Sequence, residues 1–222
     1  MKTKVKVSKT SKMPCKSWSL EAITTCPASI GEDGELVDAC KGCYATTGFY
    51  LMPDAKNLRD YNLQDWRREE WVADMITEIR NQKYFRWFDS GDVAWTKLAE
   101  KIYEVCLNTP DCKHWLPTRM YKFDKFVPIL DKIDALPNVN VRFSSDSVLG
   151  QYNTKHGSTI IPTDTFSIDG FICEAYTRGG KCGDCRACWD KEIPLIAYVA
   201  HGKKMENLIK TVEAEEIKAR AI

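Results

Sequence analysis

Hydrophobic side chains follow two different periods along the central part of the chain. Within residues 63–80 they recur at the helical spacing i, i+3, i+4, i+7 from Val72 to Ile79, which predicts an amphipathic helix. The aromatic run at 84–88 ends in a polar turn and is typical of a strand. The same criteria predict further helices at 98–105, 123–133 and 205–221, and further strands at 114–118, 139–143, 160–162, 171–173 and 195–200.

Strands that alternate with helices imply a parallel sheet with right-handed crossovers. In a parallel α/β barrel the carboxyl ends of the strands share one face, and that face holds the chemistry. The predicted units are too few for a complete eight-stranded barrel. We therefore expect an α/β fold of the partial (β/α) barrel type, followed by a cysteine-rich segment near the C-terminus.

Polar residues follow three successive predicted strands. Asp89-Ser-Gly-Asp92 follows the first strand, Arg119 the second, and Ser144-Ser-Asp146 the third. At the reactive face of a barrel, carboxylates can contact a ligand and an arginine can neutralise an anion. Turn formation, helix capping and ion pairing are the structural alternatives for the same residues. The candidate catalytic residues are Asp89, Asp92, Arg119 and Asp146, and the candidate cofactor-binding residues are Ser90, Gly91 and Ser144.

The composition narrows the class of protein. With 32 basic and 31 acidic residues among 222, the formal net charge of +1 gives no general attraction to nucleic acid or membranes. No apolar run resembles a signal peptide or a membrane span, so we expect a cytoplasmic protein, in which ten cysteines favour metal binding over disulfides. We expect one domain over residues 1–222, consisting of a basic arm (1–14), the partial barrel with its N-terminal cysteine loop (15–165), and the cysteine-rich segment with a helix (166–222).

Four cysteines near the C-terminus have the spacing of metal ligands. Cys182, Cys185 and Cys188 are separated by two residues each, and Cys173 stands nine residues ahead of them. Their sulfurs can converge on one small volume, and soft thiolate sets of this kind select zinc or iron–sulfur clusters. The C-x2-C-x2-C run is that of bacterial ferredoxins without the x3-C that follows it there. We expect a metal site in which Cys173 is the fourth ligand.

A second group of cysteines lies near the N-terminus. Cys40 and Cys43 share one turn, and Cys26 can approach them through the Gly-containing loop between. Three thiolates leave one iron of a 4Fe–4S cluster without a protein ligand, so that a small molecule or cofactor can bind there. Cys15, separated from Cys26 by ten residues, is either a fourth ligand that closes this site or a packed core residue.

Three motifs resemble, in the same order, those of the phage gene product 88 family. They comprise residues 25–29 with 40–44 and 47–48, residues 86–95, and residues 182–189. That family in turn is similar to the radical S-adenosylmethionine enzymes, which use a partial α/β barrel, a three-cysteine 4Fe–4S cluster and often auxiliary clusters. The resemblance implies an open cluster on Cys26, Cys40 and Cys43 and a closed one on Cys173, Cys182, Cys185 and Cys188.

Two features of the chain depart from that enzyme pattern. The compact C-x3-C-x2-C motif is stretched to C-x13-C-x2-C. Asp89-Ser-Gly-Asp92 replaces the glycine-rich segment that holds the methionyl amine of the cofactor. Carboxylates can nevertheless accept hydrogen bonds from an ammonium group.

Three functional hypotheses follow. The first is a radical-type oxidoreductase or lyase, in which the open cluster binds and reduces S-adenosylmethionine and the second cluster relays electrons from a donor protein. The second is an iron–sulfur protein that transfers electrons or binds a small molecule without S-adenosylmethionine, and the missing glycine segment favours it. The third is a zinc-binding nucleic-acid module, which the near-zero net charge disfavours. A phage-encoded chain would work in the host cytoplasm.

Overall fold

The computed structural model describes residues 3–152 and 157–220 as a mixed α/β fold around an open, eight-stranded sheet. The strand order is β1-β2-β3-β4-β5-β6-β8-β7, with β1 antiparallel to β2 and the other neighbouring strands parallel. The predicted α/β class is therefore confirmed. The strands are β1 (Ser8–Lys9), β2 (Lys16–Trp18), β3 (Tyr84–Trp87), β4 (Lys113–Thr118), β5 (Val139–Ser144), β6 (Gly157–Ile161), β7 (Phe171–Cys173) and β8 (Leu195–Val199).

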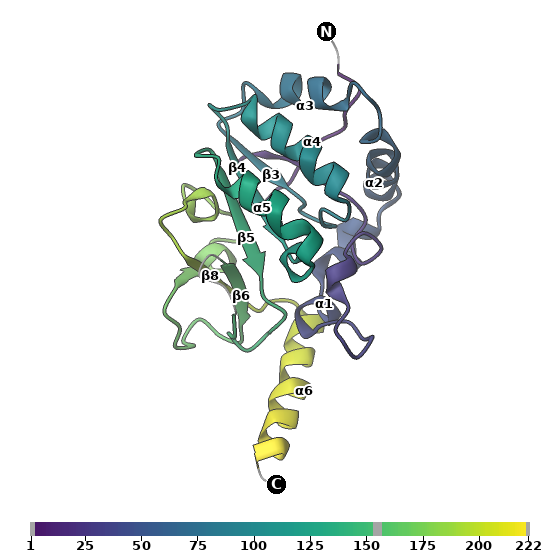
Figure 1. Cartoon of the computed structure of the whole chain (residues 1–222). Coiled ribbons are helices and arrows are strands. Elements are labelled where there is room, and N and C mark those ends of the chain that lie inside the picture. Colours follow the sequence, from purple (N-terminus) through teal and green to yellow (C-terminus); the bar gives the residue numbers. More distant parts are fainter. Residues whose placement is uncertain (1–2, 153–156, 221–222) are drawn as a thin grey trace.

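Helices cover one face of this sheet. Figure 1 shows α3, α4 and α5 side by side across it, and α6 extending away from the body beside α1. No helix within the described ranges is both long and apolar enough to cross a membrane. The α-helices are α1 (Asp38–Lys41), α2 (Pro53–Asp65), α3 (Trp71–Ile79), α4 (Thr96–Leu107), α5 (Val127–Asp134) and α6 (Lys203–Arg220). Short 3-10 helices are η1 (Pro27–Ser29), η2 (Tyr44–Thr46), η3 (Gly48–Leu51), η4 (Met120–Lys122), η5 (Asp124–Phe126), η6 (Glu174–Tyr176) and η7 (Ala187–Trp189).

Several elements differ in extent from the predicted ones. The helix predicted over 63–80 is wrong in extent, because α2 ends at Asp65 and α3 begins at Trp71. The helix predicted at 123–133 begins later, because residues 124–126 form η5 and α5 starts at Val127 with Pro128 in its first turn, where the missing N–H costs nothing. The strand predicted at 160–162 begins earlier, at Gly157 of β6. The helix predicted at 205–221 corresponds to α6, and residue 221 lies outside the described part of the chain.

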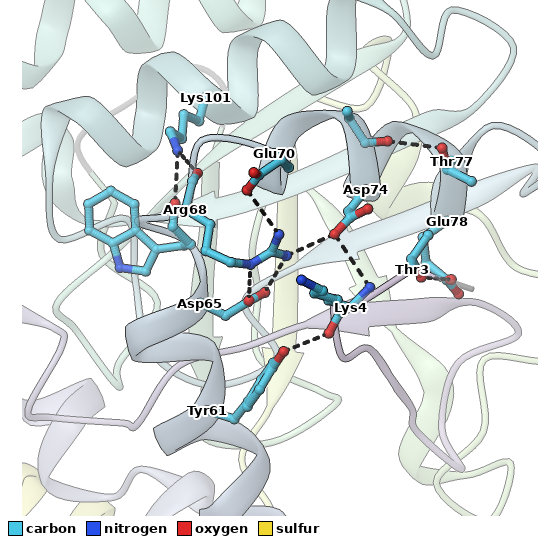
Figure 2. Close-up of polar contacts among 12 residues, drawn as sticks. Thr3, Lys4, Tyr61, Asp65, Arg68, Glu70, Asp74, Thr77, Glu78 and Lys101 are labelled. Carbon is cyan, nitrogen blue, oxygen red and sulfur yellow. Dashed lines mark hydrogen bonds and ion pairs between the residues drawn. The ribbon is translucent and has the colours of Figure 1, made fainter. Parts of the chain in front are cut away.

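An arginine network fixes the break between α2 and α3. Figure 2 shows the guanidinium group of Arg68 between the carboxylates of Asp65 (2.5 Å from Nε) and Asp74 (2.8 Å from Nη2). The hydrogen bond to Asp65, opposed by burial, raises the pKa of Arg68. Lys101 of α4 donates to the backbone carbonyls of Trp66 (3.0 Å) and Arg68 (2.5 Å). The turn at 66–70 is thus tied to three helices, which explains why one continuous helix does not form.

Side chains of the central strands alternate between two environments. In β4, Leu116 is buried in the main core, whereas Trp115 packs on the other side against Trp189 of η7 with ring centroids 5.5 Å apart. The main core contains a tryptophan cluster in which Trp18 and Trp71 meet edge to face at 5.4 Å. Such aromatic pairs contribute about 0.5–1.5 kcal/mol beyond the area they bury. The cysteine-rich segment therefore lies on the sheet face opposite to the helices.

His114 makes the stability of the fold depend on pH. Its ring is buried, stacks on Trp87 and bonds through Nε2 to the hydroxyl of Thr109 (2.9 Å). That hydroxyl donates to the carbonyl of Val105, so Nε2 carries the proton and donates to Thr109. Burial lowers the pKa of His114 to about 3.

Acidification should destabilise the protein through His114. Between about pH 6.5, the unfolded value, and pH 3, the unfolded state binds more protons than the native state, so stability falls as pH falls. We expect this histidine to contribute a slope of up to about 1.4 kcal/mol per pH unit in that window. Urea unfolding at several pH values should show a shallower slope for His114→Gln than for the wild type. Equal slopes would contradict this prediction.

Candidate functional site

The first candidate site contains the cysteines of the N-terminal loop, and we call Cys26, Cys40 and Cys43 the N-terminal cysteine site. Cys26 precedes η1, Cys40 lies in α1, and Cys43 precedes η2, with its N–H donating to the carbonyl of Cys40 (3.1 Å). Burial raises the pKa of Cys26, and the charges of Asp92 and of the other two thiols raise it further. The fold therefore brings together the three cysteines that sequence spacing grouped.

The carboxylate of Asp92, beside this site, accepts three hydrogen bonds. It is buried and accepts from Val93 N–H (2.7 Å), the Thr118 hydroxyl (2.7 Å) and Arg119 N–H (2.9 Å). Burial outweighs these bonds and raises the pKa of Asp92. Asp92 N–H donates to the carbonyl of Thr25 (3.2 Å). This residue joins the ends of β3 and β4 to the segment that carries Cys26.

Arg119 and Asp146 form an ion-pair network at the same edge of the sheet. Asp146 lies 3.2 Å from Arg119 Nε and 2.6 Å from Lys122 Nζ. Burial opposes the charge of Arg119, but Cys40, Asp146 and Asp92 raise its pKa overall. The backbone carbonyl of Asp146 accepts from Ala39 N–H (2.9 Å), directly before Cys40. Asp146 thus contacts α1, which carries Cys40, and Arg119 is tied to Asp146 through the ion pair.

The remaining strand-end candidates hold neighbouring chain segments. Asp89 accepts hydrogen bonds from Ser19 and from the Tyr50 hydroxyl (3.1 Å), and the Ser90 hydroxyl donates to the carbonyl of Leu20 (2.7 Å). The backbone carbonyl of Ser144 accepts from the Tyr121 hydroxyl (3.1 Å). The contacts of Asp89 and Ser90 fasten residues 19–20 to the end of β3.

Three residues in the segments 19–26 and 88–92 have left-handed backbone conformations. Gly91 has φ +78°, and a Cβ there would lie 2.8 Å from both Leu20 Cβ and Thr25 Oγ1. Ile23 (φ 66°) and Phe88 (φ 54°) are non-glycine residues in the left-handed region, which costs roughly 1–3 kcal/mol each. Such strain at a β-branched residue three positions before Cys26 requires strong support from the surrounding structure.

The second candidate site is formed by Cys173, Cys182, Cys185 and Cys188, which we call the C-terminal cysteine site. Cys173 ends β7, and the other three lie in the loop before and within η7. All four line one small cavity whose other walls are mainly apolar. The fold therefore assembles the four thiols that the sequence grouped.

Two polar residues of β5 hold the loop of this site. Arg142 is fully buried and donates to five backbone carbonyls, at distances from 2.9 to 3.4 Å. Asn140 donates to the carbonyls of Cys188 (3.1 Å) and Asp190 (3.0 Å). The five carbonyls that accept from Arg142 belong to Gly157, Ala187, Cys188, Asp190 and Ile193.

Cationic side chains surround the C-terminal cysteine site. Burial raises the pKa of Cys188 to about 11, while Arg142 and Arg86 act in the opposite direction. Burial also raises the pKa of Cys182, against the effect of Lys12 and Arg86. Positive charge near thiols stabilises the thiolate form that binds metals.

Cys15 lies beside the C-terminal cysteine site. It packs in a cluster with Met13 and Trp189, against which Cys182 and Cys188 also pack. Burial raises the pKa of Cys15 to about 12, with opposing contributions from Arg86 and Arg186. The sequence offered Cys15 as a fourth ligand of the N-terminal group or as a core residue, and it did not suggest this neighbourhood.

Arg86 links the two sites and was missed as a candidate. Its Nη2 donates to the Tyr44 hydroxyl (3.1 Å), directly after Cys43, and its Cζ lies 4.4 Å from the centroid of the Trp115 ring. Its Nη1 contacts Met13 Sδ at 3.6 Å. A single arginine inside the aromatic strand 84–88 was the available signal, since a charge there must find buried partners.

The donor groups of the two sites do not surround a single metal ion. Within the described ranges, no group of three or more histidine, cysteine, aspartate or glutamate side chains is arranged to hold a metal ion. The ligands of a four-iron cluster bind separate irons and do not have to converge on one ion. Four soft thiols line one small, mainly apolar cavity, and thiolates are the ligand type that zinc and iron–sulfur clusters select.

The sequence model of the gene product 88 family matches residues 1–191. Neither a curated protein nor a solved structure matches the chain. The match covers both cysteine sites and the polar ends of β3, β4 and β5. The chain therefore belongs to the gene product 88 family.

Proposed function

We propose that this chain is an iron–sulfur protein with two 4Fe–4S clusters. The observation that carries the proposal is the gathering of seven cysteines into two separate groups, three beside Asp92 and Arg119 and four around one cavity. Cys26, Cys40 and Cys43 would hold a cluster with one open iron. Cys173, Cys182, Cys185 and Cys188 would hold a closed one.

A radical-type enzyme is the activity that we propose for this arrangement. When bound, an open cluster supplies one electron and a coordination position for a ligand such as S-adenosylmethionine. An open, mostly parallel sheet with the reactive group at its carboxyl edge is compatible with a partial (β/α) barrel. Asp92 uses three acceptor positions internally, which leaves one lone-pair position of its carboxylate for a ligand.

Arg119 and Lys122 would orient the ligand at the open site. Both pair with Asp146, and Arg119 interacts with the charges of Cys26 and Cys40. A ligand carboxylate could therefore be held by Arg119 while the loops at 19–26 and 89–92 exclude water. The Tyr44 hydroxyl, which donates to the carbonyl of Asp89 (2.6 Å), would fix the position of the chain after Cys43.

One observation favours the alternative of an iron–sulfur protein that transfers electrons or binds a small molecule without S-adenosylmethionine. Asp89, Ser90 and Gly91 are engaged in holding residues 19–25, so this loop offers no free glycine-rich backbone for a methionyl amine. A zinc-binding nucleic-acid module receives less support. Zinc holds its thiolate ligands about 2.3 Å away around one ion, and no group of three or more side chains within the described ranges has such an arrangement. We place the protein in the host cytoplasm, where its thiols would stay reduced and a donor protein would supply electrons.

Metal analysis of protein purified without oxygen tests this proposal. We expect about eight irons and eight sulfides per chain, and about four of each after replacing Cys26, Cys40 and Cys43 by alanine. Replacing Cys182, Cys185 and Cys188 should also leave about four, whereas Cys106→Ala, a buried thiol of α4, should leave the full amount. Zinc in place of iron would refute the proposal. A change in the paramagnetic spectrum on adding S-adenosylmethionine would select the radical enzyme, and iron without that change would select the alternative.

A further inference from the structure

The C-terminal cysteine site has one thiol more than a four-iron cluster needs. Cys15 is 4% exposed and packs in the cluster that includes Cys182 and Cys188. The cavity is lined by the other four cysteines, and Cys15 belongs to the buried cluster against which two of them, Cys182 and Cys188, pack. Five thiols from three separate segments of the chain therefore meet in one region.

The segment that carries Cys15 is fastened to the cysteine loop. The N–H of Cys182 donates to the carbonyl of Lys12 (2.9 Å), and Arg86 Nη1 contacts Met13 Sδ (3.6 Å). Trp115 and Trp189 complete the cluster around Cys15. Residues 12–15 are therefore a fixed wall of the site and hold the Cys15 thiol next to two of its ligands.

Only two of the four thiols belong to the surroundings of Cys15. Cys182 and Cys188 pack against the cluster that contains Cys15, whereas Cys173 and Cys185 line the cavity without joining that cluster. The charges of Cys182 and Cys188 also act on Cys15. A sulfur lost at either position would therefore leave its space at the cluster of Cys15, and one lost at Cys173 or Cys185 would not.

We propose that Cys15 is a reserve ligand of the C-terminal cysteine site, which binds iron in place of Cys182 or Cys188 when either thiolate is lost. This inference rests on the proposed function, that the site holds iron. In the exchange the Cys15 thiol releases its proton to solvent, and its sulfur forms the bond to iron that the missing thiolate would have formed. No electron is transferred. A purely packed Cys15, behaving as a small apolar residue, is the alternative.

Iron content of full-length variants purified without oxygen distinguishes these possibilities. We expect Cys182→Ala, Cys188→Ala and Cys15→Ala each to keep about eight irons, and Cys173→Ala and Cys185→Ala to fall to about four. The double variants Cys15→Ala/Cys182→Ala and Cys15→Ala/Cys188→Ala should also fall to about four. Thermal unfolding of each single and double variant shows whether any loss of iron reflects a loss of folding.

Alkylation supplies a second readout. In native Cys188→Ala protein, removing the iron with a chelator should increase the reactivity of Cys15 with iodoacetamide, as measured by mass spectrometry, whereas in the wild type, where Cys15 only packs, it should increase much less. Equal increases in the two proteins would contradict ligation by Cys15. Folded Cys182→Ala and Cys188→Ala proteins with only about four irons would overturn the inference while leaving the proposed function intact. Wild-type protein without iron would overturn both.

Discussion

Replacing Arg142 by methionine should lower the free energy of unfolding by about 2–4 kcal/mol and release the C-terminal cysteine site. The guanidinium group is fully buried and donates to five backbone carbonyls, four of them in residues 187–193. Methionine fills similar space but cannot donate, so the carbonyls of Gly157 and Ile193 lose this bond, while those of Cys188 and Asp190 keep their bonds from Asn140 and that of Ala187 keeps its bond from Asp190 N–H. Each buried group left unsatisfied costs about 1–3 kcal/mol unless water reaches it. Urea unfolding measures the loss, and the alkylation rate of Cys188 in the native protein reports the release.

Two control variants show how much of the stability loss is due to the hydrogen bonds of Arg142, as opposed to its charge or to the replacement of any arginine. Arg142→Lys keeps the positive charge but lacks the planar fork, so its stability should lie between those of the methionine variant and the wild type. Arg80→Met removes an exposed arginine at the end of α3 and should change stability by no more than about 0.5 kcal/mol. Similar losses for Arg142→Met and Arg80→Met would refute the role given to Arg142.

Replacing Asp92 by alanine should cost about 3 kcal/mol or more and expose Cys26 to alkylation. Three buried donors, on Val93, Thr118 and Arg119, would lose their acceptor. Asp92→Asn should cost less, because one amide oxygen can still accept while the amide nitrogen faces a donor. Chemical unfolding and mass spectrometry of the alkylated native protein measure the two effects.

Asp92 should also lower stability at higher pH. Burial raises its pKa in the native state above the unfolded value, so between the two values the native state binds more protons and stability falls as pH rises. The asparagine variant should lack this contribution. Asp60→Asn, at an exposed position of α2, provides the matched control and should leave both stability and Cys26 reactivity unchanged. An Asp92→Ala protein as stable as Asp60→Asn would show that the three hydrogen bonds of Asp92 contribute nothing.

Apolar periodicity predicted the central elements well, since β3, β4, β5 and α4 place regular apolar faces in the main core. The same method could not find α2. Its buried residues are Arg59, Asn62 and Asp65, which are held by hydrogen bonds such as that from Asn62 to the carbonyl of Ser19 (3.0 Å). A helix whose buried face is polar has no apolar stripe to detect.

Local spacing grouped the cysteines, because thiols two residues apart are neighbours in almost any loop. The position of Cys15 depends on a contact between Lys12 and Cys182, which no local pattern reveals. The polar strand ends were located at the carboxyl edge of the sheet, but their individual partners were not. Gly91 illustrates the reason, since its close approach to Leu20 and Thr25 is set by tertiary packing.

Because β8 lies between β6 and β7, the sheet cannot be completed until this late strand has been synthesised. A ribosome delivers β6 and β7 first; β6 can pair with β5, but β7 has no neighbour in the sheet until residues 195–199 emerge. The C-terminal cysteines lie before that strand in the chain, so they emerge before the sheet that will hold them is complete. The contacts of these cysteines with residues 12–15 join distant parts of the chain, and contacts between residues far apart in sequence form slowly during folding. We therefore expect the nascent chain to expose these thiols to the cell until β8 has been translated.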